Sequence, residues 1–333
     1  MTDRHSVSSS VRDFLDSVHL GSRQLHKSLT IWPLIGGIES TLEYVPLALA
    51  IEKGWIVVDE LSEGGRVPTI RVRNRGDLAA LILFGEELVG AKQNRIANAS
   101  FLVAPKSDLL IDVSCVEQGR WSAGRGTPFA SGGSVVAHSI RSSMQRQVAA
   151  SRATGSFEAD QSQVWEAVSE RLDLSGARSF TGAYQDYAES RRTDCEEILR
   201  AFHFVPGQVG FVAAIHDEVR GAELLGRPEV LERLLPGLLS SYAIDAVDWE
   251  SLRSRRGRAL YEAPEPFLGV LRDARWRQSA SLGLGEDLRL EGDGVEGSAL
   301  DADGIVHLTA SVVDAPPTPR FLRRRSAGAR RRH

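Results

Sequence analysis

Three features are scarce in this 333-residue sequence: cysteine, long apolar runs and lysine. The two cysteines, Cys115 and Cys195, have no CxxC partner, which excludes a disulfide framework and a cysteine-rich zinc module. No apolar run approaches the roughly 20 residues that a membrane-spanning helix needs, and the first residues lack the apolar stretch of a secretory signal. We therefore expect a cytoplasmic protein that is neither secreted nor bound to a membrane.

The motifs of several common enzyme classes are also missing. The sequence contains no P-loop, no GxGxxG after a strand and no GxSxG elbow. It has no HxH, HExxH or acid-rich spacing that would predict a metal site. These absences exclude the standard nucleoside-triphosphatase, dinucleotide-binding and α/β-hydrolase interpretations, and they leave any cofactor unknown.

Arginine carries nearly all the positive charge, because only four of the 40 basic residues are lysines. Seven arginines lie within residues 320–333, which contain no acidic residue. Removing these seven charges changes the net charge from −4 to −11, so the rest of the chain lacks the basic face that duplex DNA requires. The tail could bind single-stranded RNA, but its one aromatic residue, Phe321, provides no stacking platform.

The hydrophobic pattern predicts an α+β fold. Residues 1–121 form a β-rich half, whose apolar segments and short turns indicate a largely antiparallel sheet, folded as a sandwich or a half-open barrel. Residues 161–312 form a second half in which helices precede C-terminal strands. Residues 122–160 are rich in Ser, Gly and Ala and predict a loop or linker, and residues 313–333 predict a disordered Arg-rich tail.

The sequence makes a specific prediction for each of two helical segments. A short helix could form around residues 140–149, inside the predicted linker. Residues 228–248 carry a Leu-rich apolar face, but Pro236 and Gly237 should kink or divide that helix.

The most polar segment is GEELVGAKQNRI, residues 85–96, which directly follows the apolar ALILF. If extended, it would place polar side chains on both faces, which is unsuitable for a core. It is either a site that converges on a polar ligand or a solvated edge strand with ion pairs. The candidate site residues are Glu86 and Glu87 as acid/base groups and Lys92, Gln93, Asn94 and Arg95 as ligand contacts.

A second polar segment is SCVEQGRW, residues 114–121. Glu117, Arg120 and Trp121 follow the regular part of a predicted strand, where Arg could hold a phosphate while the indole stacks on a base. The alternative is a salt-bridged Arg that covers a half-buried Trp. Cys115 shares the apolar face of this strand, so we expect it in the core rather than as a nucleophile.

His307 lies on the less apolar face of a strand predicted at residues 304–312. It could act as a catalytic base or ligand contact, or it could be a hydrogen-bonded structural histidine.

Several of these segments resemble a bacterial family named ARG-and-rhodanese-phosphatase-superfamily-associated protein domain. The resemblance covers about residues 10–312 and rests on GEELVGAKQNRI and SCVEQGRW, with support from QVWEAV, GAELLG, LLSSYAIDA and GIVHL. The family is defined mainly by neighbouring genes, which encode ADP-ribosylglycohydrolases and rhodanese-type phosphatases. The resemblance therefore implies a role in handling ADP-ribose or a related NAD-derived nucleotide, with those proteins as candidate partners.

Two functional hypotheses follow, and whether the chain is an enzyme stays open between them. In the first, it acts on an ADP-ribose-like nucleotide, with Glu86 or Glu87 as the acid/base group and Lys92 and Arg95 as phosphate contacts. Gln93 and Asn94 would then read the ribose or base, and Arg120 with Trp121 would hold the adenine. In the second, the same polar face binds the ligand or a partner protein without turnover. Lys92 stands out because a lysine, where arginine is the rule, suits a site that needs a compact and titratable charge.

Overall fold

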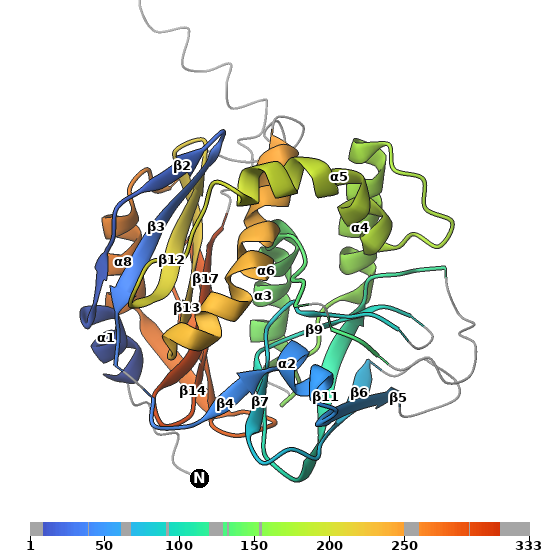
Figure 1. Cartoon of the computed structure of the whole chain (residues 1–333), viewed down its shortest axis with the longest axis horizontal. Coiled ribbons are helices and arrows are strands. Elements are labelled where there is room, and N and C mark those ends of the chain that lie inside the picture. Colours follow the sequence, from blue (N-terminus) through green and yellow to red (C-terminus); the bar gives the residue numbers. More distant parts are fainter. Residues whose placement is uncertain are drawn as a thin grey trace, which may run out of the picture.

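The computed structural model describes residues 9–38, 40–60, 68–90, 93–119, 129–131, 133–152, 155–249, 260–292 and 294–313. These residues form seven helices and seventeen strands in mostly antiparallel sheets, which confirms the predicted α+β class. Figure 1 shows the strands in two groups with helices between them. Among the residues described, no helix is both long enough and apolar enough to cross a membrane.

The largest sheet joins strands from both ends of the chain. Its members are β1 (Val18–Leu20), β2 (Gln24–His26), β3 (Leu29–Gly36), β12 (Gln208–Ile215), β13 (Glu218–Leu225), β14 (Arg275–Ala280), β15 (Glu286–Glu291), β16 (Val295–Asp301) and β17 (Ile305–Val312). The strand order is β1-β3-β12-β13-β17-β16-β15-β14, with β2 beside β3, and every one of these pairings is antiparallel. The pairing of β3 with β12 therefore places the N-terminal strands in one sheet with the C-terminal strands.

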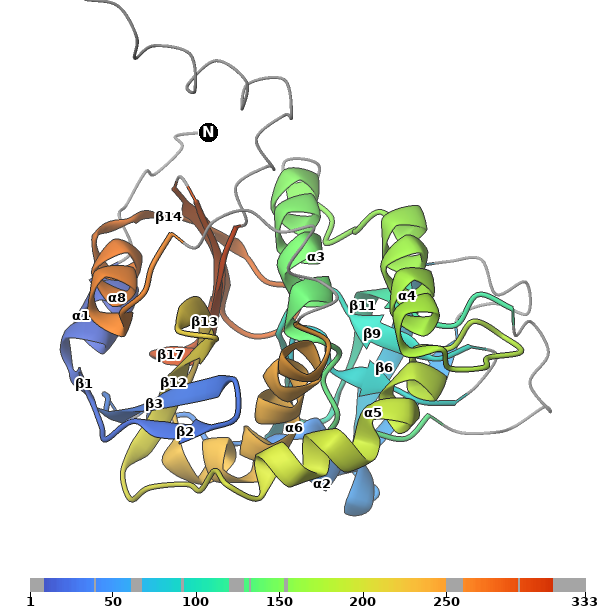
Figure 2. The ribbon, with the colours of Figure 1, turned by 90° about the horizontal axis from the view of Figure 1, so that it is seen from above.

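The large sheet is covered on both faces, and β12 shows why its sequence is apolar throughout. All eight residues of β12 are buried. Val212 and Ala214 face the core with α1 (Ser9–Asp16) and α8 (Pro264–Asp273), whereas Phe211 and Ala213 face the core with α3 (His138–Ser151) and α6 (Pro228–Val247). Figure 2 shows α1 and α8 within the curve of the sheet and α3 and α6 on its other side.

Two smaller sheets enclose a third core together with α2 (Leu47–Glu52). Their strands are β4 (Tyr44–Pro46), β5 (Ile56–Glu60), β6 (Thr69–Asn74), β7 (Ala79–Ile82), β8 (Glu87–Leu88), β9 (Arg95–Ala97), β10 (Phe101–Val103) and β11 (Ser107–Cys115). They are ordered β10-β7-β4 and β5-β6-β11-β9-β8, and β4 with β7 is the parallel pair. The antiparallel character expected for this half is confirmed.

Two helices complete the layer beside these sheets, α4 (Gln161–Ser175) and α5 (Tyr184–Leu199). Helix α3 confirms the helix expected around residues 140–149 and exceeds it at both ends. The proposed domain boundaries stay a prediction. The Arg-rich tail from residue 314 lies outside the described residues.

Of the two outcomes expected for the 228–248 helix, a kink or a division, the division is wrong, because α6 continues through Pro236 and Gly237 to Val247. Proline within a helix costs about 3 kcal/mol or more. Here the apolar residues before and after the proline, including Leu235 and Leu238, are buried in the core. The burial of these residues outweighs the helix-breaking preference of Pro236, so the helix stays continuous.

Candidate functional site

A tight turn follows β7 and leads directly into β8, so that Glu86 closes the turn and pairs with Val135, and Glu87 begins the extended strand. The Glu86 amide donates to the Leu83 carbonyl, and Glu86 Oε2 accepts from the Leu83 amide, both at 3.0 Å. Gly85 has a φ of +76°, and a Cβ there would lie 2.3 Å from Arg141 Cδ, so the turn requires glycine. Glu86 and Glu87 are directed inward, with 1% and 3% of their surface exposed.

A serine-bearing segment, residues 129–131 and 133–136, packs along this turn. Its backbone pairs with the Glu87 amide through Ser134 O (2.9 Å) and with the Gly85 carbonyl through Val136 N (3.0 Å). Ser131 Oγ donates to Glu86 Oε1 at 2.7 Å, and Ser134 Oγ donates to Glu87 Oε2 at 3.3 Å. We call Glu86, Glu87, Ser131 and Ser134 the acid–serine cluster.

Burial changes the acidity of both carboxyl groups in this cluster. It raises the pKa of Glu86 to about 7, against the lowering effect of hydrogen bonds from the Leu83 amide and Ser131. It also raises the pKa of Glu87 to about 7, and Glu117 adds to the rise while Ser134 opposes it. Near neutral pH each carboxyl is therefore present both as acid and as base.

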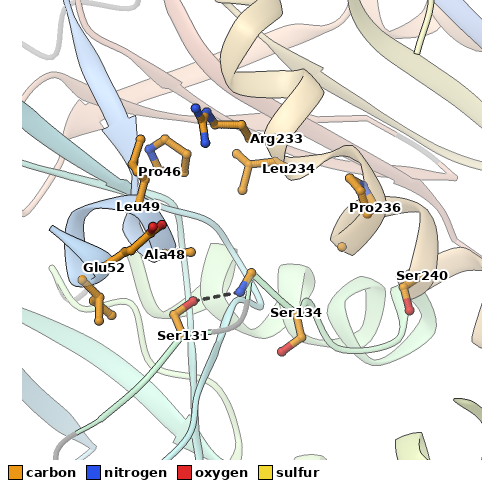
Figure 3. A pocket seen from close by; sticks show the side chains of 13 residues that line it. Pro46, Ala48, Leu49, Glu52, Ser131, Ser134, Arg233, Leu234, Pro236 and Ser240 are labelled. Carbon is orange, nitrogen blue, oxygen red and sulfur yellow. Dashed lines mark hydrogen bonds between the residues drawn. The ribbon is translucent and has the colours of Figure 1, made fainter. Parts of the chain in front are cut away.

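Two clefts open on either side of the acid–serine cluster. The first, about 550 Å3 in volume, lies against α5, and we call it the α5 cleft. The second, about 610 Å3, lies between α2 and α6, and we call it the α2 cleft (Figure 3). Ser134 and Ser240 line both clefts, so the clefts adjoin at these two serines. Glu87 lines the α5 cleft, and its buried Oε1 has no hydrogen-bond partner among the residues that the structure describes.

The predicted amide residues lie beside the α5 cleft, and both hydrogen bond to Glu117. Gln93 Nε2 donates to the Glu117 carbonyl at 2.9 Å, and the Asn94 amide donates to Glu117 Oε2 at 3.2 Å. Asn94 Nδ2 donates to Oε1 of Gln185, which lines the cleft, at 3.2 Å. Thr181 Oγ1 holds the second oxygen of Glu117 at 2.9 Å. The structure thus brings the two polar motifs together, as a layer behind the cleft wall.

Comparison with known protein families identifies the domain to which these residues belong. The model of the ARG and Rhodanese-Phosphatase-superfamily-associated Protein domain matches residues 17–311. The chain belongs to this family, ARPP-1. No curated protein and no solved structure matches it. The matched range includes the acid–serine cluster, both clefts and the amide layer, so all of these belong to the ARPP-1 domain.

Arg95 of this ARPP-1 domain is buried, although the sequence suggested a phosphate contact. Its Nη1 donates to Cys115 Sγ at 2.8 Å, and its Nη2 lies 3.7 Å from Glu60 Oε1. It is 3% exposed and lines neither cleft. Cys115 is buried as expected, and burial, opposed by Arg95, raises the pKa of its thiol.

His307 lies behind the acidic turn, within a buried network. Its Nδ1 contacts Ser100 Oγ at 2.6 Å, and Ser100 Oγ accepts from the Phe84 amide at 3.0 Å. Its Nε2 lies 3.2 Å from Glu223 Oε2, and Arg141 Nη1 lies 2.7 Å from Glu223 Oε1. His307 is 1% exposed and lines neither cleft, so this geometry supports a role in holding the turn.

Three of the predicted site residues, Lys92, Arg120 and Trp121, lie outside the described residues. Sequence reasoning missed Ser131 and Ser134, because they fall in the stretch assigned to a linker. Its Ser and Gly content, directly before a helix, was the available signal. Among the described residues, no three His, Cys, Asp or Glu side chains are grouped to bind a metal ion.

Proposed function

We propose that this chain binds and processes an ADP-ribose-like, NAD-derived nucleotide, with Glu87 exchanging a proton with the ligand in the α5 cleft. The observation that carries this proposal is the state of Glu87. It is a buried carboxyl with a pKa raised to about 7, it belongs to a residue that lines the α5 cleft, and its buried Oε1 has no hydrogen-bond partner among the described residues. A group with a pKa near the working pH can donate and accept protons with comparable ease.

The reaction that suits this geometry is cleavage of a bond at the ribose of such a nucleotide. The departing group needs a proton and the attacking water must lose one, and a carboxyl near pKa 7 can supply both steps in turn. The amide of Gln185 and the phenol of Tyr184, on the same wall, can hydrogen bond to ribose hydroxyls. The ligand class is what the family resemblance noted above implies through the neighbouring ADP-ribosylglycohydrolases; the family description itself names ARG and rhodanese-phosphatase proteins.

The test is calorimetric titration with ADP-ribose and NAD, followed by chromatographic analysis of the products. We expect the wild-type chain to bind and convert one of these nucleotides, and Glu87→Gln to retain binding but lose about 10²- to 10⁴-fold in turnover. Glu166→Gln, an exposed position on α4, is the matched control and should behave as wild type. Failure of the wild-type chain to bind either nucleotide would overturn the proposal.

One observation favours an alternative, a binding module without turnover. Gln93 and Asn94 each hydrogen bond to Glu117, which suits a rigid recognition surface as well as an active site. In that case the nucleotide, or a partner such as an ADP-ribosylglycohydrolase or a rhodanese-type phosphatase, would occupy the same face. Nucleotide binding without any product, in wild type and Glu87→Gln alike, would favour this alternative.

A further inference from the structure

The α2 cleft has a firm wall where α6 meets the serine-bearing segment. A Cβ on Gly237 would lie 2.0 Å from the Gly133 carbonyl oxygen, so helix and segment touch through their backbones. Only glycine permits this approach, which explains the residue that follows Pro236 in the helix. Ser131 Oγ also accepts from the Gly133 amide at 3.2 Å, which holds the segment at the same point (Figure 3).

Charged side chains of opposite sign lie on the two walls of this cleft. Arg233 extends from α6 and Glu52 from α2, and Figure 3 shows them on separate walls with the serines below. Both side chains are exposed. No ion pair joins Arg233 to any residue that the structure describes. Its guanidinium group is therefore available to a ligand.

Within the part of the chain that the structure describes, the α5 cleft lacks such an unpaired cation. Its arginine, Arg192, lies 2.9 Å from Glu189 Oε1 and 2.9 Å from Glu196 Oε1, and both acids also line the cleft. With Glu87 and Asp186 this wall is acidic and would repel a diphosphate. A ligand that places its sugar at Glu87 must therefore place its phosphates elsewhere.

We infer that the α2 cleft is the diphosphate-binding subsite of the ligand, with Arg233 as the residue that binds it. The inference rests on the proposed function. The planar guanidinium matches two phosphate oxygens at once, and Glu52 accepts hydrogen bonds from sugar hydroxyls on the opposite wall. Leu49, Leu234 and Pro236 supply apolar surface for the rest of the ligand. From this subsite the ligand passes Ser134 and Ser240 to reach Glu87, which assigns one end of the molecule to each cleft.

Binding of two probes, inorganic pyrophosphate and ADP-ribose, tests the assignment. Arg233→Glu and the milder Arg233→Gln are compared with wild type and with Arg23→Glu, an exposed position outside both clefts. We expect Arg233→Gln to weaken binding of both probes about 10- to 100-fold, the range for a hydrogen bond to a charged group. Arg233→Glu should weaken it further, and Arg23→Glu should leave it unchanged. Raised salt should weaken wild-type binding more than that of Arg233→Gln.

The outcomes separate this inference from the proposed function. Pyrophosphate binding that depends on Arg233, without ADP-ribose binding, supports the subsite and rejects the proposed nucleotide. ADP-ribose binding that is equal in wild type and both Arg233 variants overturns the subsite and leaves the proposed function standing. Absence of binding of either probe to the wild-type chain overturns both. Circular dichroism and thermal melting establish that each variant is folded before its affinity is compared.

Discussion

Glu87 and Glu223 are both buried glutamates, yet their surroundings shift the pKa in opposite directions. Glu223 lies 2.7 Å from Arg141 Nη1 and 3.2 Å from His307 Nε2, and it accepts from the Tyr242 hydroxyl at 3.1 Å. Burial alone would raise its pKa, but Arg141 and His307 outweigh burial and lower the pKa to about 2. Among the described residues, Glu87 has one serine at 3.3 Å and no ion pair with a cation, and burial raises its pKa to about 7.

The comparison shows that burial does not by itself decide what a carboxyl can do. A neighbouring cation fixes Glu223 as a permanent anion, which suits it to hold Arg141 and His307 in place. Burial, with no cation among the described neighbours to oppose it, lets Glu87 keep a proton that can leave near neutral pH, which suits it to chemistry. The two sites are connected through the turn that precedes Glu87. Gly85 of this turn packs on Arg141, and the Phe84 amide donates to Ser100 Oγ.

The largest expected effect comes from removing the cation that fixes Glu223. Arg141→Met should lower the free energy of unfolding by about 3–5 kcal/mol, because Glu223 would remain as an uncompensated buried charge. Urea denaturation followed by circular dichroism measures this loss. Arg23→Met, at an exposed position, is the control and should change stability by no more than about 0.5 kcal/mol. A loss below about 1 kcal/mol for Arg141→Met would show that Glu223 does not depend on its cation.

The pH dependence of stability should have opposite signs at the two sites. Glu86 and Glu87 bind protons more tightly in the folded chain, with a pKa of about 7 against an ordinary 4.5. Their contribution is present below pH 4.5 and is lost as pH rises to about 7, by about 3 kcal/mol for each carboxyl. Glu223, with its pKa lowered from 4.5 to about 2, contributes above pH 4.5 and loses that contribution as pH falls.

Urea denaturation between pH 3 and pH 8 separates these two contributions. The double variant Glu86→Gln, Glu87→Gln should reduce the loss of stability between about pH 5 and pH 7 relative to wild type. Glu223→Gln should leave that loss unchanged and reduce the pH dependence below about pH 4.5. If the free energy of unfolding of the double variant and wild type depends on pH in the same way throughout, burial does not raise the pKa of these two carboxyls.

A smaller loss of stability is expected from changing Ser100, which links His307 to the turn that precedes Glu87. Ser100→Ala removes the partner of both His307 Nδ1 and the Phe84 amide, and should cost about 1–3 kcal/mol of stability. If this contact positions the acidic turn, the variant should also shift the pH profile of any turnover that depends on Glu87. Ser100→Thr, which keeps the hydroxyl, should restore the profile. A stability loss with an unmoved pH profile would mean that Ser100 is structural only.

The smallest expected effect concerns the one hydrogen bond that opposes the raised pKa of Glu87. Ser134→Ala removes that bond, so the pKa of Glu87 should rise further. Because Ser134 is exposed, stability should change by only about 1 kcal/mol or less. The measurement is the pH at which turnover, or the Glu87 carboxyl signal, is half-titrated. A shift to lower pH would contradict the assigned role of Ser134.

Much of the fold could be predicted from local pattern, because alternating and continuous apolar runs report directly on one-sided and two-sided burial. The fully apolar β7 and the short helix α3 are examples. The acidic pair and the amides of Gln93 and Asn94 also stood out, since polar groups behind a buried strand are costly unless they are satisfied. In each case the signal is carried by residues close together in the chain.

The remainder depends on contacts between distant segments. Glu223 meets His307 across 84 residues, and Glu87 meets Ser134 across 47, so the opposite pKa shifts of the two glutamates leave no local trace. Arg233 sits on a Leu-rich helix whose pattern indicates only that one face is buried. Its position above a cleft follows from how α6 packs on the serine-bearing segment, which tertiary structure alone determines.

The acidity of Glu87 itself tests the central claim most directly. Carbon-13 NMR of glutamate carboxyl groups can follow its titration, with the resonance identified by its absence in Glu87→Gln. The account predicts a midpoint near pH 7 in the free chain and a displaced midpoint when ADP-ribose is bound. A midpoint near the ordinary 4.5, unaffected by ADP-ribose, would contradict it.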